Sequence, residues 1–396
     1  MRVLGIDPGT KTMDLCLLDN GEVVGEASIE TSKVASNPET VLEEISKLKP
    51  FDVIVVPSGY GVEPLDLERI PRDLLEEWYY TFVLATTREE ILESFEKGII
   101  GAKIYFAMVR LVEKLYELEA KKILIPGVIN LPTIPLHRKI NKIDMGTADK
   151  LAVAVLGIHE VASTLGVDYE HVNYIHVELG FGYNAVMGVE KGLIVDGIGG
   201  SFTPGPGFLT AGALDLEVAQ SIGKLDKKDV FTTGCGPLTG VPTPEDMVEK
   251  SGSDWRSKIC LEAFIEGVVK SVHQIMHSVK NPDLILLSGR VSRIPGIRVE
   301  LEKRLGGISQ VKAMKGLPGA RSVKETAQGY SVVGDGLTGG VFKDLITHVK
   351  VDGAVGSALD YVLIPAFFES RLGRNFLRLR GVGFRTQPLN TSWWSS

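Results

Sequence analysis

The feature that most constrains the fold is an order of strand and helix signals that occurs twice along the chain. Three strand-like segments, a helical segment, a further strand and a further helix follow one another, and the same order returns from residue 174 onward. Asn20-Gly21, between the second and third strands, is a strong hairpin turn signal. The two series share a pattern but no residue-by-residue repeat, so we predict two halves with similar α/β folds. The strand-like segments are 2–8, 13–19, 22–29 and 51–59 in the first series, and 174–180, 185–192, 193–199 and 282–290 in the second.

Length and composition limit the classes of protein that this chain can represent. With 396 residues it suits two domains of roughly 150–200 residues each, and its hydrophobic share of 44% excludes disorder as the main state. The net charge of −7 argues against nucleic acid as the main ligand, because duplex-binding proteins usually lean basic. No apolar stretch approaches a membrane span, and no secretory signal is present. We therefore expect a cytoplasmic protein with no membrane partner.

The first candidate site follows the first strand, in the segment GIDPGTKT. The strand delivers Asp7 to a turn, and Gly9 lets backbone N–H groups come close to an anion. Thr10 and Thr12 add hydroxyl donors, and Lys11 adds a cation. The carboxylate of Asp7 can hold Mg²⁺ through water. An ordinary hairpin turn explains the same residues about equally well.

Two further strand ends carry glycine turns in the second half. The segment ELGFG after residue 177 offers a second phosphate cradle, and a plain hairpin is the alternative. The segment LLSGR ends a buried strand, where bare backbone can seat an adenine or a ribose, and a simple strand-to-helix turn is the alternative. The candidate nucleotide contacts are Gly180, Phe181 and Gly182 in the former and Ser288, Gly289 and Arg290 in the latter.

Two acidic residues lie at a predicted helix start between the halves, in IDMGTADK. Asp149 falls in the first helical turn, where the helix dipole favours negative charge, so it can be a helix-end stabiliser. Asp144 precedes the helix and has the better claim to chemistry, as a metal ligand or a base. Further along, the small residues of 325–330 suit either close helix packing or a hinge.

Taken in order, these segments resemble the acetate/butyrate kinase family of the actin-like ATPase superfamily. The resemblance is clearest over residues 174–340, and within the family it points to the archaeal-type proteins described as predicted butyrate kinases. IHVELGFGYNAVMGVEKGLIVDG looks like the second phosphate segment, PDLILLSGRVSRIPGIRVELEKRL like the adenosine segment, and ETAQGYSVVGDG like the late hinge. GIDPGT looks like the first phosphate segment, with Asp7 where these acyl kinases usually have Asn.

The resemblance implies an α/β fold of two duplicated ribonuclease-H-like domains, each with a mixed five-stranded sheet, and a cleft between them. We expect these domains at 1–168 and 169–370, with a C-terminal helix or tail at 371–396. The implied activity is transfer of the γ-phosphoryl group of ATP to a short-chain carboxylate, with Mg²⁺ held by Asp7 and Glu325. Asp144, Asp149 and Arg138 join Asp7 as candidate catalytic residues. A homodimer is compatible with this reading.

The sequence also departs from the family pattern. Ser58 stands where the family usually has an arginine, Met145 lies near a usual histidine, Glu178 replaces another histidine, and Thr210 replaces a substrate-side arginine. The residues available to substitute for the lost charges are Arg88, Arg138, Lys139 and Arg290. These departures keep open a hydroxyl acceptor, for which Asp144 or Asp149 would serve as base, and a regulatory nucleotide-binding protein. A nuclease of the ribonuclease-H-like fold is a third hypothesis, against which the acidic charge weighs.

Overall fold

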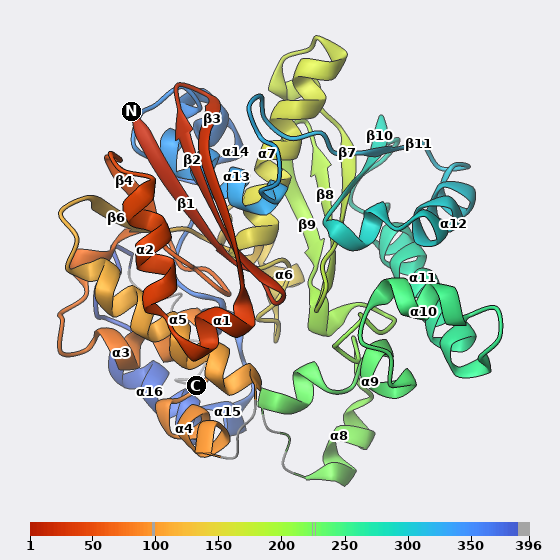
Figure 1. Ribbon diagram of the computed structural model, residues 1–396, viewed down its shortest axis with the longest axis horizontal. Helices are drawn as coiled ribbons and strands as arrows, with labels where there is room; N and C mark the ends of the chain where they lie inside the picture. The colour runs from red at the N-terminus through yellow and green to blue at the C-terminus, as the bar shows by residue number, and fades with distance from the viewer. Residues whose placement is uncertain (97–99, 224, 226, 387–396) are drawn as a thin grey trace. The chain divides into compact units, whose positions relative to one another are not determined.

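The computed structural model describes residues 1–96, 100–223, 225 and 227–386 (Figure 1). Packing divides the chain into two compact units. Unit 1 comprises Met1–Ile143, Thr147–Leu156 and the chain from Leu317 onward, and unit 2 comprises Asp144–Gly146 and Gly157–Gly316. None of the helices in the described part of the chain has the length and apolar character needed to cross a lipid bilayer.

Unit 1 is built on a mixed sheet with the strand order β3-β2-β1-β4-β6-β5. The strands β1, β2 and β3 form an antiparallel meander, β4 and β6 continue the sheet in parallel with β1, and β5 pairs antiparallel with β6. Asn20 and Gly21 both have positive φ, 49° and 88°, as the predicted tight hairpin requires. The strands are β1 (Arg2–Pro8), β2 (Thr12–Asp19), β3 (Glu22–Glu30), β4 (Val53–Val55), β5 (Leu65–Asp66) and β6 (Lys121–Leu124).

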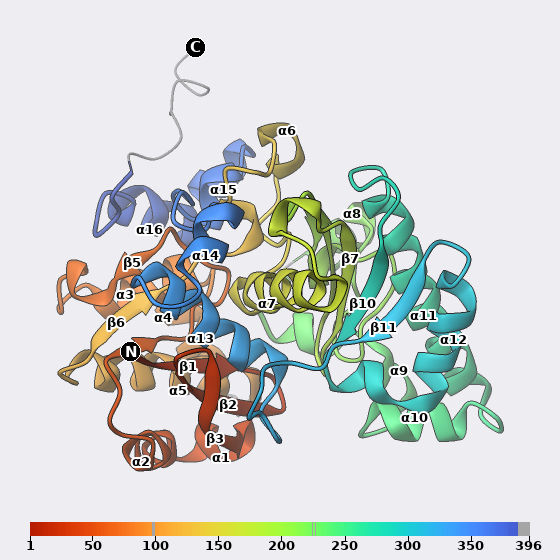
Figure 2. The same cartoon turned by 90° about the horizontal axis from the view of Figure 1, so that it is seen from above.

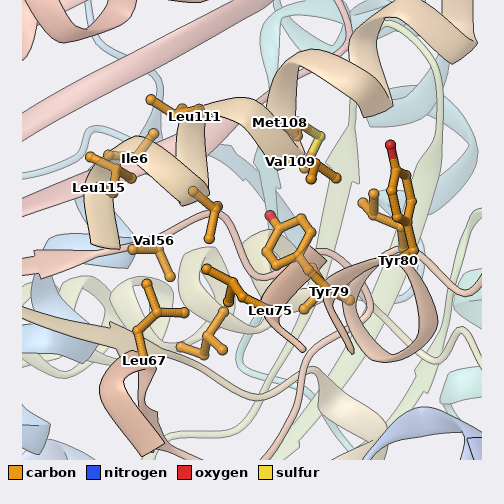
Figure 3. Packing of buried hydrophobic residues seen from close by; sticks show 14 of the residues in the cluster. Ile6, Val56, Leu67, Leu75, Tyr79, Tyr80, Met108, Val109, Leu111 and Leu115 are labelled. Atoms are coloured by element: carbon orange, nitrogen blue, oxygen red, sulfur yellow. The ribbon is translucent and has the colours of Figure 1, made fainter. Parts of the chain in front are cut away.

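Helices cover the sheet of unit 1. Figure 3 shows side chains of α5, among them Met108, Leu111 and Leu115, in the buried cluster that also holds Ile6 of β1 and Val56 after β4. Figure 2 shows α13 beside β1, and a Cβ on Gly5 of β1 would lie 2.7 Å from the carbonyl oxygen of Ala327 in that helix. The helices are α1 (Thr31–Ser36), α2 (Glu39–Lys47), α3 (Leu75–Trp78), α4 (Arg88–Glu96), α5 (Ile100–Tyr116), α6 (Leu136–Lys139), α13 (Glu325–Leu337), α14 (Lys343–Val349), α15 (Pro365–Glu369) and α16 (Arg371–Leu379).

Unit 2 repeats the same sheet design. Its strand order is β11-β10-β7-β8-β9, in which β7, β8 and β9 are antiparallel while β10 and β11 run parallel to β7. The strands are β7 (Tyr174–Leu179), β8 (Asn184–Glu190), β9 (Leu193–Ile198), β10 (Leu284–Ser288) and β11 (Gln310–Ala313). The helices are α8 (Leu216–Ile222), α9 (Cys235–Thr239), α10 (Pro244–Lys250), α11 (Trp255–Ile275) and α12 (Pro295–Leu305), and α7 (Ala148–Leu165) contributes to both units.

The predicted duplication is confirmed, because β1-β2-β3-β4-β6 and β7-β8-β9-β10-β11 have the same order and directions. The sheet of unit 2 has the five strands expected, whereas that of unit 1 has a sixth, β5, whose two residues are too short to give a strand pattern. Residues 317–370, expected in the second half, pack in unit 1, because α13 is buried against β1 and β2. Of the predicted tail, α16 is a helix, and residues 387–396 lie outside the described residues.

Candidate functional site

The turn between β1 and β2 holds the first predicted phosphate cradle. In the antiparallel register, Asp7 lies directly opposite Asp14, and both side chains are buried. The Lys324 Nζ lies 2.7 Å from Asp7 Oδ2 and 3.0 Å from Asp14 Oδ2. Thr326 Oγ1 donates to Asp7 Oδ2 at 2.6 Å, and Thr12 Oγ1 donates to Asp14 Oδ2 at 2.8 Å. The first turn is therefore a buried network of two carboxylates, one ammonium group and two hydroxyls.

Electrostatics tie the members of this network together. Burial raises the pKa of Asp7, and Asp149 and Asp14 add to the rise while Lys324 opposes it. For Lys324, burial favours the neutral amine, but the two carboxylates outweigh burial and raise its pKa. Lys324 therefore remains an ammonium group at neutral pH.

The rest of this turn is shaped by glycine and by backbone contacts. A Cβ on Gly9 would lie 2.1 Å from Lys324 Nζ and 2.6 Å from the carbonyl oxygen of Thr12, so only glycine leaves the ammonium its place. The carbonyl oxygen of Gly9 accepts a hydrogen bond from Thr31 Oγ1 at 2.7 Å. Of the other predicted contacts, Thr10 is half-buried and Lys11 is exposed. The structure thus brings Gly9 and Thr12 together around one cation, and the contacts of Gly9, Thr10, Lys11 and Thr12 with a nucleotide stay a prediction.

The two acidic residues near the start of α7 make separate sets of contacts. Asp149, in the first turn of α7, lies 2.6 Å from Lys150 Nζ and is also bonded to Thr147 Oγ1. Burial alone would raise the pKa of Asp149, but the Lys150 ammonium, the Thr147 hydroxyl and the Lys324 ammonium together outweigh burial and lower it. Asp144 accepts the backbone N–H of Gly146 at 3.0 Å. The contacts of Asp149 fit the helix-end role, and the catalytic roles predicted for Asp144 and Asp149 stay predictions.

The second predicted cradle is the turn between β7 and β8. The Gly180 N–H donates to the carbonyl oxygen of Tyr183 at 2.9 Å, and the carbonyl oxygen of Gly182 accepts from Leu209 at 3.4 Å. The ring of Phe181 packs against the ring of Phe208, with 5.0 Å between the two ring centroids. The first bond closes the turn, and the bond from Leu209 and the ring of Phe208 hold it against the 207–210 loop. In that loop Thr210 is buried, and its hydroxyl has no hydrogen-bond partner among the described residues.

The third predicted segment ends β10. The Ser288 hydroxyl is buried and lies 2.7 Å from His176 Nε2 on the neighbouring strand β7. Gly289 has φ +81°, and a Cβ there would lie 2.3 Å from the carbonyl oxygen of Leu179 and 2.8 Å from Glu178 Oε1. Arg290 is exposed after the turn. Glycine is thus required at 289 by backbone geometry, whether or not a nucleotide binds there.

The remaining predicted residues lie at separate places in unit 1. Arg138 is half-buried on α6, and its carbonyl oxygen accepts from Lys142 Nζ at 2.7 Å. Glu325 is buried at the first residue of α13, next to the residues that contact Asp7. Ser58 is fully buried, donates to the Val56 carbonyl oxygen at 2.8 Å and accepts from a backbone N–H, so it has a structural role. The roles predicted for Arg138 and Glu325 stay predictions.

Sequence reasoning missed three members of the first turn: Lys324, Asp14 and Thr326. Asp14 could have been found, because a hairpin that pairs Pro8 with Met13 must also pair Asp7 with Asp14. Lys324 and Thr326 flank Glu325, which the sequence did single out, but no local signal links that segment to the first strand. Their contacts with Asp7 come only from the packing of α13 against β1 and β2.

Comparison with known proteins shows the family to which the chain belongs and the solved structures whose fold it shares. Residues 5–364 match the model of a protein family described as "Protein of unknown function (DUF1464)". Among curated proteins, none matches the sequence. Solved structures match at 12–14% identity, which shows a shared fold alone.

Three of these structures superpose over most of both chains. An acetate kinase from Porphyromonas gingivalis is 13% identical, with a TM-score of 0.56 over 83% of this chain and 98% of that chain. A propionate kinase from Francisella tularensis subsp. tularensis SCHU S4 is 14% identical, with a TM-score of 0.55 over 83% and 98%. An acetate kinase from Entamoeba histolytica is 12% identical, with a TM-score of 0.51 over 78% and 87%. The chain therefore has the two-domain fold of actin-like ATPases that these kinases share.

Proposed function

The chain belongs to the DUF1464 family, and from that premise and its fold we propose that it is an ATP-dependent phosphotransferase that acts on a short-chain carboxylate. The observation that carries the proposal is the turn at Gly9, where an ammonium group and a buried aspartate meet at a backbone bend that admits only glycine. An ammonium that offsets carboxylate charge at a glycine turn leaves the backbone of the turn able to approach phosphate oxygens. Similarity to acetate and propionate kinases supports the acceptor class.

The chemistry that we propose asks the protein for position and charge more than for proton transfer. A carboxylate acceptor is already ionised at neutral pH, so no base is needed. One of its oxygens would bond to the γ-phosphorus while the bond from that phosphorus to the β–γ bridging oxygen breaks, and ADP would leave. The residues of the Gly9 turn would bind phosphate oxygens.

The surroundings of Asp7 decide whether Asp7 and Glu325 can hold the expected Mg²⁺. Bound to a nucleotide, such an ion would neutralise phosphate charge. The Asp7 Oδ2 atom already accepts from Thr326 and lies 2.7 Å from Lys324 Nζ. Within the described residues, no group of three or more His, Cys, Asp or Glu side chains is placed to hold a metal. A metal site built by the protein on this oxygen does not fit while Lys324 is in place, so no step is assigned to the ion.

The proposal is tested by nucleotide binding and by trapping of the product. We expect calorimetry to show binding of ADP and of a non-hydrolysable ATP analogue, and Gly9→Ala to weaken it about tenfold or more, because a Cβ there would lie 2.1 Å from Lys324 Nζ and would close the turn to phosphate. Gly381→Ala, in unit 1 where a Cβ would meet nothing within 4 Å, is the matched control and should bind like the wild type. With ATP and acetate, propionate or butyrate, hydroxylamine should trap an acyl phosphate as the hydroxamate. Absence of nucleotide binding would refute the proposal.

A second candidate, phosphoryl transfer to a hydroxyl group, is favoured by Ser58 and Thr210. Both stand where the resemblance predicts arginines, and Ser58 is committed to backbone bonds, so these positions supply no positive charge for an anionic acceptor. A hydroxyl acceptor needs a base, for which Asp144 is the candidate. ADP release with sugars or polyols, together with no hydroxamate from the carboxylates, would select this candidate.

A further inference from the structure

Two aspartates face each other across the β1–β2 hairpin. Asp7 and Asp14 are a directly opposed pair in the antiparallel register, with exposed fractions of 1% and 0%. Like charges that are directly opposite destabilise a strand pair, and buried carboxylates need a partner of opposite charge. The hairpin is therefore viable with both groups ionised only if a cation lies between them.

Lys324 is that cation, and its three N–H donors all find acceptors. Its Nζ lies 2.7 Å from Asp7 Oδ2, 3.0 Å from Asp14 Oδ2 and 3.3 Å from the carbonyl oxygen of Thr12. The side chain is largely enclosed, and Gly9 leaves the space that the ammonium fills. A lysine whose donors are all used, between two carboxylates, is a built site for a positive charge.

We propose that Lys324 takes the place of a divalent metal at Asp7 and Asp14, so that a covalently attached ammonium offsets the carboxylate charge of the Gly9 turn that would otherwise repel nucleotide phosphates. Two opposed carboxylates with hydroxyls beside them are the oxygen donors that Mg²⁺ and Mn²⁺ prefer. With Lys324 in place, a metal ion would have to displace the ammonium from both carboxylate oxygens. The nucleotide part of this inference rests on the proposed function, whereas the metal part concerns the protein alone.

The first test measures metal binding without nucleotide. In wild-type protein, excess Mg²⁺ or Mn²⁺ should leave the Tm unchanged relative to EDTA. Lys324→Met should have a lower Tm and should gain about 2–4 °C from metal present at about five times its Kd, because the two carboxylates have then lost the ammonium that neutralises them. Lys33→Met, an exposed lysine of α1, is the matched control and should behave like the wild type. Equal metal stabilisation of the wild type and Lys324→Met would overturn the inference.

Two further variants distinguish metal binding at the two carboxylates from a general folding defect in Lys324→Met. Lys324→Arg keeps the charge and should show no metal stabilisation. The double variant Lys324→Met with Asp14→Asn removes one of the two carboxylates, so it should recover part of the lost stability and lose the gain from metal. Metal stabilisation that persists in the double variant would place the metal elsewhere and overturn the inference.

The second test links the ammonium to nucleotide. By calorimetry, the wild type should bind ADP in EDTA within about threefold of its affinity in Mg²⁺, whereas Lys324→Met should lose about tenfold or more in EDTA and recover in Mg²⁺. A wild type that binds only with Mg²⁺ would overturn the inference but leave the proposed function standing. No binding by any variant in either buffer would refute the proposed function, and the metal test would still decide the role of Lys324.

Discussion

A methyl group added at Gly289 tests the turn that ends β10. Gly289 has φ +81° and ψ 152°, a region that is essentially restricted to glycine. A Cβ there would lie 2.3 Å from the carbonyl oxygen of Leu179 and 2.8 Å from Glu178 Oε1. The carboxylate end can shift, but the carbonyl belongs to β7, which is paired on both sides. Gly289→Ala therefore cannot be absorbed by a side-chain movement alone.

The loss of stability in Gly289→Ala has two parts, the cost of the backbone conformation and the cost of the inserted methyl group. A non-glycine residue in this backbone region costs about 1–3 kcal/mol, and insertion of a methyl group into a filled space costs about 1–3 kcal/mol more. A total of about 2–6 kcal/mol is a large part of the usual stability of a domain. With a urea dependence of about 2–3 kcal/mol per molar, the unfolding midpoint of unit 2 should fall by about 0.7–3 M.

The assay is urea unfolding followed by circular dichroism, with Gly307→Ala as the matched control. Gly307 is also in unit 2, but a Cβ there would meet nothing within 4 Å. The free energy of unfolding of Gly307→Ala should therefore differ from that of the wild type by no more than about 0.5 kcal/mol, as for a neutral surface change. At urea concentrations where Gly289→Ala is still folded, ADP binding should also be weaker than in the control. If both variants unfold at the same midpoint, the geometry assigned to this turn is refuted.

Three other outcomes are expected. Burial lowers the pKa of Lys139 to about 8 from 10.5, so between these pH values the unfolded chain binds more protons than the folded protein, and the free energy of unfolding rises with pH. The advantage of Lys139→Met over the wild type in urea midpoint at pH 7 should therefore shrink toward pH 10, and a constant difference would contradict this. Cys260 is partly exposed while the other two cysteines are buried, so titration with a disulfide reagent should find one reactive thiol in the native protein, and Cys260→Ser should remove it. A Cβ on Gly329 would lie 2.4 Å from the carbonyl oxygen of Ala152, so Gly329→Ala should lose about 1–3 kcal/mol in thermal or urea unfolding while Gly381→Ala, which meets nothing within 4 Å, should not.

The local pattern of the sequence was enough to predict the repeated strands and the turns between them. Alternating apolar runs, Asn20-Gly21 and the glycines after β1, β7 and β10 act over a few residues, so their conformations are encoded where they occur. The same reasoning singled out Asp7 and Gly9 as candidate site residues, and the register of the hairpin implies Asp14 as the partner of Asp7. The small residues near Gly329 suited either close helix packing or a hinge, and the close approach of Ala152, whose carbonyl oxygen would lie 2.4 Å from a Cβ on Gly329, fits the first.

Only the tertiary structure decided which residues complete the site and where each segment packs. Lys324 meets Asp7 because α13 is buried against β1 and β2, and the same packing brings the chain from Leu317 onward into unit 1. Ser58 becomes a backbone anchor because its hydroxyl accepts from the N–H of Ile125, a residue that the sequence around Ser58 does not specify. Such contacts join residues far apart in the chain, and they form only when burial of apolar faces fixes the elements against one another. A charge that must be neutralised can be recognised in the sequence, but which residue neutralises it is set by packing.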